Sequence, residues 1–121
     1  MSNWSTKVET WFLDLCRTDP DSADRVEEAI EVLEQRGPGL GRPLVDRIKD
    51  SSVHNLKELR PASAGGTEIR ILFVFDVERC AVLLVAGDKC GRWKQWYSDA
   101  IPLAEKRYHR YLTELEVDLD G

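Results

Sequence analysis

The sequence predicts an α+β domain in which two N-terminal helices pack on an antiparallel, meander-like sheet that is followed by a C-terminal helix. Two observations predict this class. Apolar residues recur at the spacing of one helical face in the first third of the chain, and they alternate with a period of two in the middle. Short, turn-rich segments join the alternating stretches, which favours antiparallel neighbours. Because a sheet must bury one face, we expect a two-layer arrangement.

Two helices are expected before residue 40. The first covers residues 7–17 and ends at Thr18-Asp19-Pro20, because proline cannot continue the hydrogen-bond ladder. The second is capped by Asp21 or Ser22 and ends at Gly37-Pro38-Gly39. Their apolar faces comprise Val8, Trp11, Phe12 and Leu15, and then Ala23, Val26, Ala29, Ile30 and Leu33.

Four extended segments follow the helices: Pro43–Lys49, Asn55–Arg60, Glu68–Asp76 and Cys80–Ala86. The third is interpreted as the central strand, since it is apolar on both faces apart from Arg70. Its alternating residues are Ile69, Ile71, Phe73 and Phe75 on one side and Arg70, Leu72 and Val74 on the other.

The last helix is expected to begin at a cap on Asp99, with Pro102 in its first turn. Residues 87–99 before it are predicted to be a polar, aromatic connection. The expected inner face of this helix consists of Leu103, Tyr108, Tyr111 and Leu112.

Composition excludes several classes of protein. No run of about 18 apolar residues is present, and the segment from Met1 to Val8 lacks the apolar core of a signal peptide, so neither a membrane span nor secretion is expected. The three cysteines, Cys16, Cys80 and Cys90, form no CxxC pair. They are interpreted as ordinary core or surface residues of a protein in the reducing cytoplasm.

Charge is distributed unevenly around a formal net value of −5. Residues 1–53 carry seven Lys or Arg and eleven Asp or Glu, whereas residues 54–113 carry ten and seven. We therefore expect one domain over residues 1–113 with a localised surface for an anionic ligand, and an acidic C-terminal tail over residues 114–121. A mixed, solvated surface would give the same counts.

Motifs for metals and nucleotides are missing from the sequence. It contains neither HExxH nor a phosphate-binding glycine loop, so no metal and no small-molecule cofactor is expected. The histidines, His54 and His109, lie far apart. His54 is interpreted either as an acid, base or RNA-stacking residue or as a solvated histidine at a strand edge.

Cations on the second and third strands are the first candidates for chemistry. In Leu56-Lys57-Glu58-Leu59-Arg60, alternation places Lys57 opposite Arg60, although the two side chains could still converge near the strand end. Arg70 is costly to bury in an apolar strand, so it must either form a salt bridge to Glu58 or Glu68 or reach a ligand. A guanidinium can grip a phosphate with two parallel hydrogen bonds, which favours the ligand.

Cations and aromatic residues also alternate after the last strand. Bases stack on aromatic rings while cations neutralise the backbone, so this pattern is typical of single-stranded RNA binding. Core packing remains the alternative for the two tryptophans. The residues are Lys89, Arg92, Trp93, Lys94, Trp96 and Tyr97.

Several segments, in order, carry a resemblance to a known family. They are Arg36-Gly37-Pro38, Leu56-Lys57-Glu58-Leu59-Arg60, Glu68-Ile69-Arg70-Ile71-Leu72-Phe73-Val74-Phe75, Val85-Ala86-Gly87-Asp88-Lys89 and Trp96-Tyr97-Ser98-Asp99-Ala100-Ile101-Pro102. Over roughly residues 7–112 the chain resembles the RelE/HigB toxins of type II toxin–antitoxin systems, in the RelE/ParE superfamily, and most of all their phage-derived, actinobacterial branch. The opening strand of that fold would be limited to residues 2–5.

The resemblance implies a RelE-like fold and a metal-independent, ribosome-dependent mRNA endonuclease that inhibits translation in the cytoplasm. In such enzymes the RNA 2′-hydroxyl attacks its own phosphate. The implied partners are mRNA, the ribosome and a cognate antitoxin, often of helix-turn-helix type. The alternatives are a related gyrase-inhibiting toxin and a catalytically weakened, antitoxin-binding module.

The resemblance also implies roles for individual residues. Arg70 would stabilise the crowded phosphate, and Lys57 and Arg60 would form a basic pair in which one residue acts as a base or electrostatic helper. Lys89 would supply the cation after the last strand, and Tyr97 would stack on a base. The residues expected to contact RNA around them are His54, Arg92, Trp93, Lys94 and Trp96.

Overall fold

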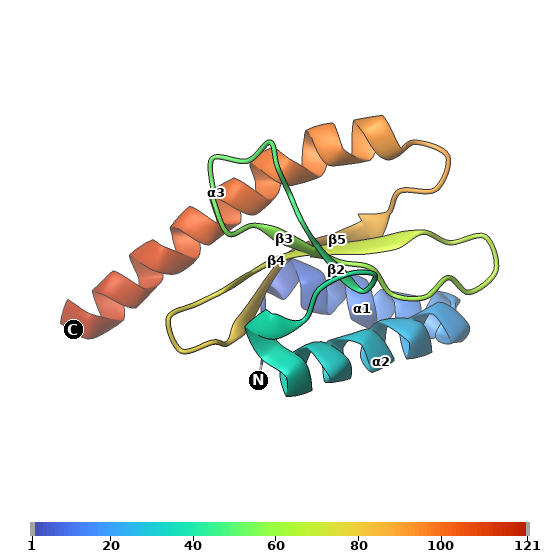
Figure 1. Cartoon of the computed structure of the whole chain (residues 1–121), viewed down its shortest axis with the longest axis horizontal. Coiled ribbons are helices and arrows are strands. Elements are labelled where there is room, and N and C mark those ends of the chain that lie inside the picture. The colour runs from blue at the N-terminus through green and yellow to red at the C-terminus, as the bar shows by residue number, and fades with distance from the viewer. Residues whose placement is uncertain (1, 121) are drawn as a thin grey trace.

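The computed structural model describes residues 2–120 and the side chains of residues 2–115. The expected α+β architecture is confirmed (Figure 1). The elements are β1 (Ser2–Trp4), α1 (Thr6–Thr18), α2 (Pro20–Arg36), the short 3-10 helix η1 (Gly37–Gly39), β2 (Val45–Arg47), β3 (Lys57–Leu59), β4 (Ile69–Phe75), β5 (Ala81–Asp88) and α3 (Trp93–Asp120). In residues 2–120 no helix is long and apolar enough to cross a membrane.

The sheet has the strand order β1-β5-β4-β3-β2. Strands β2 to β5 are antiparallel neighbours in chain order, so the expected meander is confirmed for these four. Strand β1 adds a short parallel edge against β5, with Ser2 opposite Ala81, which makes the whole sheet mixed. β2 and β3 are shorter than the segments expected for them, and β5 continues two residues further, to Asp88.

Helices cover both faces of the sheet, so the expected two-layer arrangement is wrong. In Figure 1, α1 and α2 lie below the sheet and α3 lies above it. The reason is visible in β4, where Ile71 and Phe73 pack towards the helix pair while Leu72 and Val74 pack towards α3. Both sides of β4 are apolar and buried, and a single layer of helices would leave one of them in water.

The two N-terminal helices begin and end at polar residues. The side chain of Ser5 accepts a hydrogen bond of 3.2 Å from the backbone of Val8 and so caps α1. The cap of α2 is Asp19, which accepts from the Ser22 backbone at 3.3 Å, and Pro20 occupies the first turn. The caps expected from Asp21 or Ser22 are therefore wrong by two or three residues. Gly37, with φ of 64°, follows α2 as expected.

Helix α3 begins at Trp93, six residues before the expected cap on Asp99. Pro102 lies inside this helix and is exposed, so its missing N–H leaves only an outward-facing gap in the ladder. Trp96, Ala100 and Ala104, which are spaced by four, carry the inner face instead.

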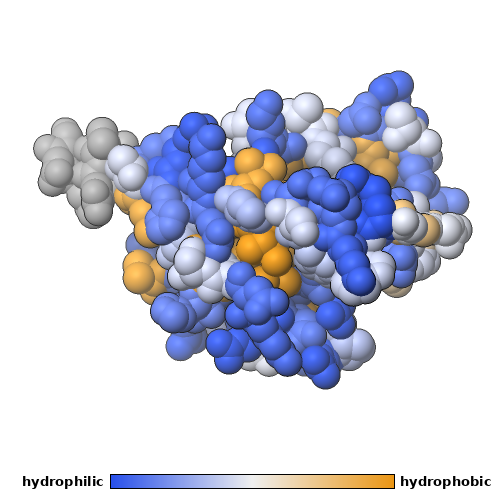
Figure 2. Space-filling model, turned by 90° about the horizontal axis from the view of Figure 1, so that it is seen from above, coloured by the Kyte–Doolittle hydropathy of each residue, from blue (hydrophilic) through white to orange (hydrophobic). Residues whose placement is uncertain are grey.

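The expected inner face of α3 is half right. Tyr108 and Tyr111 pack against the core, whereas Leu103 and Leu112 are 38% and 37% exposed. The helix continues to Asp120, and Figure 1 shows it running past the edge of the sheet. Viewed from the side of α3, most of the surface is hydrophilic, with a narrow apolar strip between the charged regions (Figure 2).

Candidate functional site

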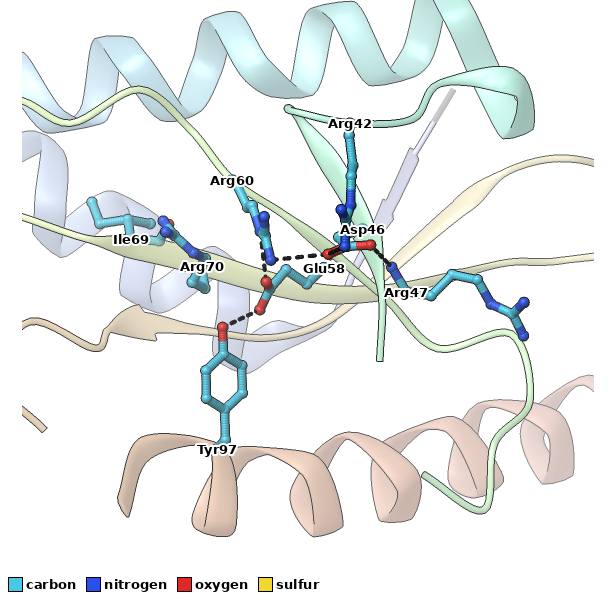
Figure 3. A network of polar contacts seen from close by, with 8 residues as sticks. All are labelled: Arg42, Asp46, Arg47, Glu58, Arg60, Ile69, Arg70 and Tyr97. Carbon is cyan, nitrogen blue, oxygen red and sulfur yellow. Dashed lines mark hydrogen bonds and ion pairs between the residues drawn. The ribbon is translucent and has the colours of Figure 1, made fainter. Parts of the chain in front are cut away.

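A row of alternating charges links β2, β3 and the start of α3 (Figure 3). The Asp46 carboxylate accepts from Arg42 at 3.0 Å and from Arg60 at 3.1 Å. Arg60 Nε also donates to Glu58 at 2.8 Å, and the Tyr97 hydroxyl donates to the other oxygen of Glu58. We call Asp46, Glu58, Arg60 and Tyr97 the acid-paired network.

Glu58 is the buried centre of this network, with only 2% of its surface exposed. Strand alternation places it opposite Leu72 of β4, on the face that α3 covers. A buried carboxylate is tolerated when it is paired and hydrogen-bonded, and Arg60 and Tyr97 supply both conditions. The sequence pattern placed Glu58 on the same face as Leu56 and Arg60 but gave it only the role of a partner for Arg70. Its position on a buried strand face was the signal that it organises the site.

The network shifts the proton affinities of its members. Burial, followed by the hydrogen bond to Glu58, raises the pKa of Tyr97 far above its usual range. The hydrogen bond to Glu58 raises the pKa of Arg60, and the hydrogen bond from Arg42 lowers the pKa of Asp46. Tyr97 therefore keeps its proton at neutral pH, and Arg60 stays charged between two carboxylates.

Arg70 lies on the next strand and is not part of the acid-paired network. Its Nη1 atom donates only to the carbonyl of Ile69, at 2.7 Å, and its buried Nε atom has no hydrogen-bond partner. Among the described side chains no carboxylate forms an ion pair with it, so the salt bridge to Glu58 or Glu68 does not form. Leaving a buried donor unsatisfied costs about 1–3 kcal/mol. The Nε atom itself is shielded from solvent, so an anion would meet the accessible part of the half-buried guanidinium.

Close packing of Trp96 on Gly87 brings α3 next to Arg70. Gly87 is the neighbour of Arg70 across the ladder, and a Cβ atom on it would lie 2.5 Å from Trp96 Nε1. Trp96 is 5% exposed and belongs to the core, so the core-packing alternative is correct and the expected RNA contact by Trp96 is not available. The packing places Tyr97 near Lys89, whose Nζ lies 5.9 Å from the ring centroid of Tyr97.

Lys57 lies on the other face of the sheet. It is opposite Phe73, and its Nζ lies 5.4 Å from the ring centroid of Phe75. Both phenylalanines pack towards α1 and α2. The convergence of Lys57 with Arg60 is therefore wrong, because regular alternation persists through all of β3.

The remaining candidates divide into two places. Arg92, Trp93 and Lys94 are exposed just before and at the start of α3, three to five residues from Tyr97, and Lys94 Nζ lies 5.5 Å from the ring centroid of Trp93. His54 is exposed in the loop between β2 and β3, in a pocket of about 250 Å³ that Arg47 and Lys49 also line.

A shallow pocket of about 350 Å³ runs beside Tyr97 along α3 and is lined also by Ser98, Ile101 and Asp50. The loop that carries Asp50 is tied to α3, since the Glu105 carboxylate accepts hydrogen bonds from Ser51 and Ser52. Tyr97 therefore presents one side to an open groove. Within the described part of the chain, no group of three His, Cys, Asp or Glu residues could hold a metal ion.

Comparison with known proteins identifies the family. Residues 13–109 match the model of the family described as "Phage derived protein Gp49-like (DUF891)". The chain belongs to this Gp49-like family, which is of the RelE/HigB type. No solved structure matches it.

Two relatives come from Mycobacterium tuberculosis (strain ATCC 25618 / H37Rv). One, named "Putative toxin HigB3", is 53% identical over 106 residues, which are 88% of this chain and 88% of that protein. The other, named "Putative toxin HigB2", is 46% identical over 113 residues, which are 93% of this chain and 56% of that protein. The chain thus spans about half the length of the second relative.

The Gp49-like region covers every candidate residue from His54 to Tyr97. At its centre, Arg70 and Lys89 form no ion pair with any side chain that the structure describes, and Lys89 lies over the ring of a neutral tyrosine beside an open groove. Such an arrangement can bind a phosphate and an adjacent ring, and it can stabilise negative charge that develops on the phosphate.

Proposed function

We propose that this HigB-like protein is the toxin of a type II toxin–antitoxin system and that it cleaves mRNA on the ribosome without a metal. In this proposal it acts in the cytoplasm, inhibits translation, and is silenced by a cognate antitoxin of helix-turn-helix type. The observation that carries the proposal is Arg70, a half-buried guanidinium that donates to the Ile69 carbonyl and forms no ion pair with a carboxylate among the described side chains. A cation in that state is suited to an anionic ligand.

In the proposed reaction the 2′-hydroxyl of the RNA attacks the adjacent phosphorus, and the bond to the 5′ oxygen of the next nucleotide breaks. The products are a 2′,3′-cyclic phosphate and a new 5′-hydroxyl end. Arg70 and Lys89 neutralise the negative charge that builds up on the oxygens of the five-coordinate phosphate, an effect worth about 2.7–4 kcal/mol for one well-placed donor. Tyr97, held by Glu58, offers its ring to a base.

Arg60 has a supporting role in this scheme. Its Nε and Nη2 atoms are engaged by Glu58 and Asp46, so it fixes the buried carboxylate that holds Tyr97 and leaves the phosphate to Arg70. The exposed residues at the start of α3, Arg92, Trp93 and Lys94, extend the contact along the RNA.

The test is expression without an antitoxin. We expect growth arrest, and primer extension on cellular transcripts should reveal new 5′-hydroxyl ends. Arg70→Ala and Lys89→Ala should each relieve the arrest, because each removes a cation from the phosphate. Arg25→Ala, which removes an exposed cation from α2, is the matched control and should remain toxic. Normal growth on expression of the unmodified protein would contradict the proposal.

A second candidate is a weakened, antitoxin-binding member of the family. It is favoured by one observation, the neutralisation of Arg60 by two carboxylates in a chain of net charge −5. Such a protein would bind an antitoxin while Arg70→Ala behaved like the parent. A third outcome, arrest with whole transcripts and a DNA damage response, would indicate inhibition of DNA gyrase instead.

A further inference from the structure

A second cationic pocket lies far from Tyr97, between the first turn of α1 and the later half of α3. It has a volume of about 390 Å³. Lys7 enters it from α1, and Arg107 and Arg110 enter it from α3. Because an α-helix rises about 1.5 Å per residue, Arg107 lies about 15 Å along α3 from Tyr97. The two places are therefore distinct.

The cations of this pocket have no acidic partner among the described side chains. Arg107 Nη1 donates to the carbonyl of Leu84 at 2.7 Å, and neither Arg110 nor Lys7 forms an ion pair there. Burial, and then the charge of Arg110, lowers the pKa of Arg107. Three positive groups face one acid, Glu114, in the lining. An anion bound between the guanidiniums would relieve their mutual repulsion.

The walls of the pocket suit a nucleotide better than a bare ion. Its volume lies within the range of about 300–1,000 Å³ that is usual for small-molecule sites. Tyr111 and Trp4 are among the lining residues, and the Trp4 ring packs against Phe12 of α1. The first turn of α1 faces the same space, and the partial positive charge of a helix N-terminus adds to the attraction of an anion.

We propose that this pocket binds the phosphate group of a nucleotide, either free or within single-stranded RNA. The proposal goes beyond the endonuclease and does not depend on it, since no residue of the pocket belongs to the acid-paired network or contacts Arg70. The pocket would hold its ligand by charge-assisted hydrogen bonds from Arg110 and Arg107, with Lys7 closing the other side.

Binding can be measured from amide chemical shifts of residues 5–7 and 107–111 in the isotope-labelled full chain. The probes are inorganic phosphate, adenosine monophosphate and a short oligouridylate with 2′-O-methyl groups, which cannot be cleaved. Saturable shifts at both segments are expected with at least one of the two nucleotide probes. If only the oligouridylate binds, the source of the phosphate is a strand, and if adenosine monophosphate binds, a free nucleotide suffices.

Variants decide whether the pocket itself holds the ligand. Arg110→Gln should weaken binding by about tenfold, as expected for loss of a charge-assisted hydrogen bond. Lys106→Gln is the matched control, because it removes an equal charge from an exposed neighbour outside the lining, and it should change the affinity by less than about twofold. Lys7→Gln, exposed on α1, serves as a second loss variant if Arg110→Gln fails to fold, and Glu114→Gln should tighten binding.

Two results would contradict the proposal that this pocket binds a nucleotide phosphate. One is the absence of saturable shifts with both nucleotide probes, even if inorganic phosphate alone binds. The other is an equal loss of affinity in Arg110→Gln and Lys106→Gln, which would indicate a diffuse positive field. Arg70→Ala should bind the probes at this pocket as the parent does. Failure of RNA cleavage with this binding intact would therefore count against the endonuclease alone.

Discussion

Arg60 and Arg70 lie near one another on the face of the sheet that α3 covers, yet their surroundings differ. Arg60 is held between Glu58 and Asp46, whereas Arg70 has a buried Nε without a partner and forms no ion pair with a described carboxylate. A charged side chain that is held in ion pairs can support the fold, whereas a buried donor without a hydrogen-bond partner lowers the free energy of unfolding. The comparison assigns structural work to Arg60 and ligand binding to Arg70. Each of the following predictions tests one side of it.

The largest effect on stability is expected from Glu58→Ala. This change leaves Arg60 with Asp46 alone and removes the acceptor of the Tyr97 hydroxyl. Loss of one partner of a buried ion pair should lower the free energy of unfolding by about 2–4 kcal/mol, measured by urea denaturation. Glu68→Gln, a half-buried acid outside the network, is the control and should change it by less than about 0.5 kcal/mol. A Glu58→Ala protein as stable as the parent would show that the network does not support the fold.

Gly87→Ala should lower both stability and activity. The added Cβ would meet the indole of Trp96 at 2.5 Å, so the buried ring and the start of α3 must move. Overpacking of this kind costs about 1–3 kcal/mol. Thermal unfolding measures the loss. Because Tyr97 moves with the helix relative to Lys89, cleavage should fall further in Gly87→Ala than in Gly66→Ala, where the added Cβ meets nothing. Equal behaviour of the two variants would argue against the role of this packing.

The hydroxyl of Tyr97 should make stability depend on alkaline pH. Burial and Glu58 raise its pKa above the ordinary value of 10.0, so the unfolded chain loses this proton first as the pH rises. The contribution is complete below pH 10.0 and is lost above it. Between about pH 10 and 12 the parent should lose stability more steeply than Tyr97→Phe. If the free energy of unfolding, measured by urea denaturation, fell equally with pH in the two proteins, the burial of this group would be contradicted.

Asp46→Asn should change the stability less than the three preceding variants do. Asp46 lies at the outer end of the network, where its partner Arg42 is 72% exposed and solvent weakens their ion pair. The lowered pKa of Asp46 means that any stability it contributes is present at neutral pH and disappears as the pH falls through that value. The urea midpoint of Asp46→Asn should move much less than that of Glu58→Ala. If the urea midpoint of Asp46→Asn fell as far as that of Glu58→Ala, Glu58 would not be the centre of the network.

Periodicity predicted the elements whose faces are clearly divided. The helix pair and the four strands after it follow from apolar spacing, and the alternation around Arg70 places the correct residues on each face of β4. The start of α3 was missed because Pro102 is typical of a first turn, although an exposed proline inside a long helix is also tolerated. The second covering layer was missed because nothing local shows which helix packs on which face.

The candidate site was predicted only in part, because sequence spacing shows which neighbouring elements meet but not how side chains pack between them. Arg70, Lys89 and Tyr97 do come together, since β4, β5 and α3 follow one another closely in the chain. Lys57 does not lie with them, because alternation places it on the other face of the sheet, and the burial of Trp96 against Gly87 depends on a tertiary contact that spacing does not show. The role of Glu58 as a link between Arg60 and Tyr97 could not be inferred from spacing, because Tyr97 lies 39 positions away.

The central claim is that the unpaired Arg70 acts on RNA phosphate while the paired Arg60 supports the fold. The most direct measurement is the rate at which purified Arg70→Gln forms 5′-hydroxyl ends on ribosome-bound mRNA, taken together with its free energy of unfolding. The account predicts a rate about a hundredfold or more below that of the parent, with the stability within about 1 kcal/mol of the parent. Cleavage by Arg70→Gln at the rate of the parent, or a parent protein that leaves the mRNA whole, would contradict it.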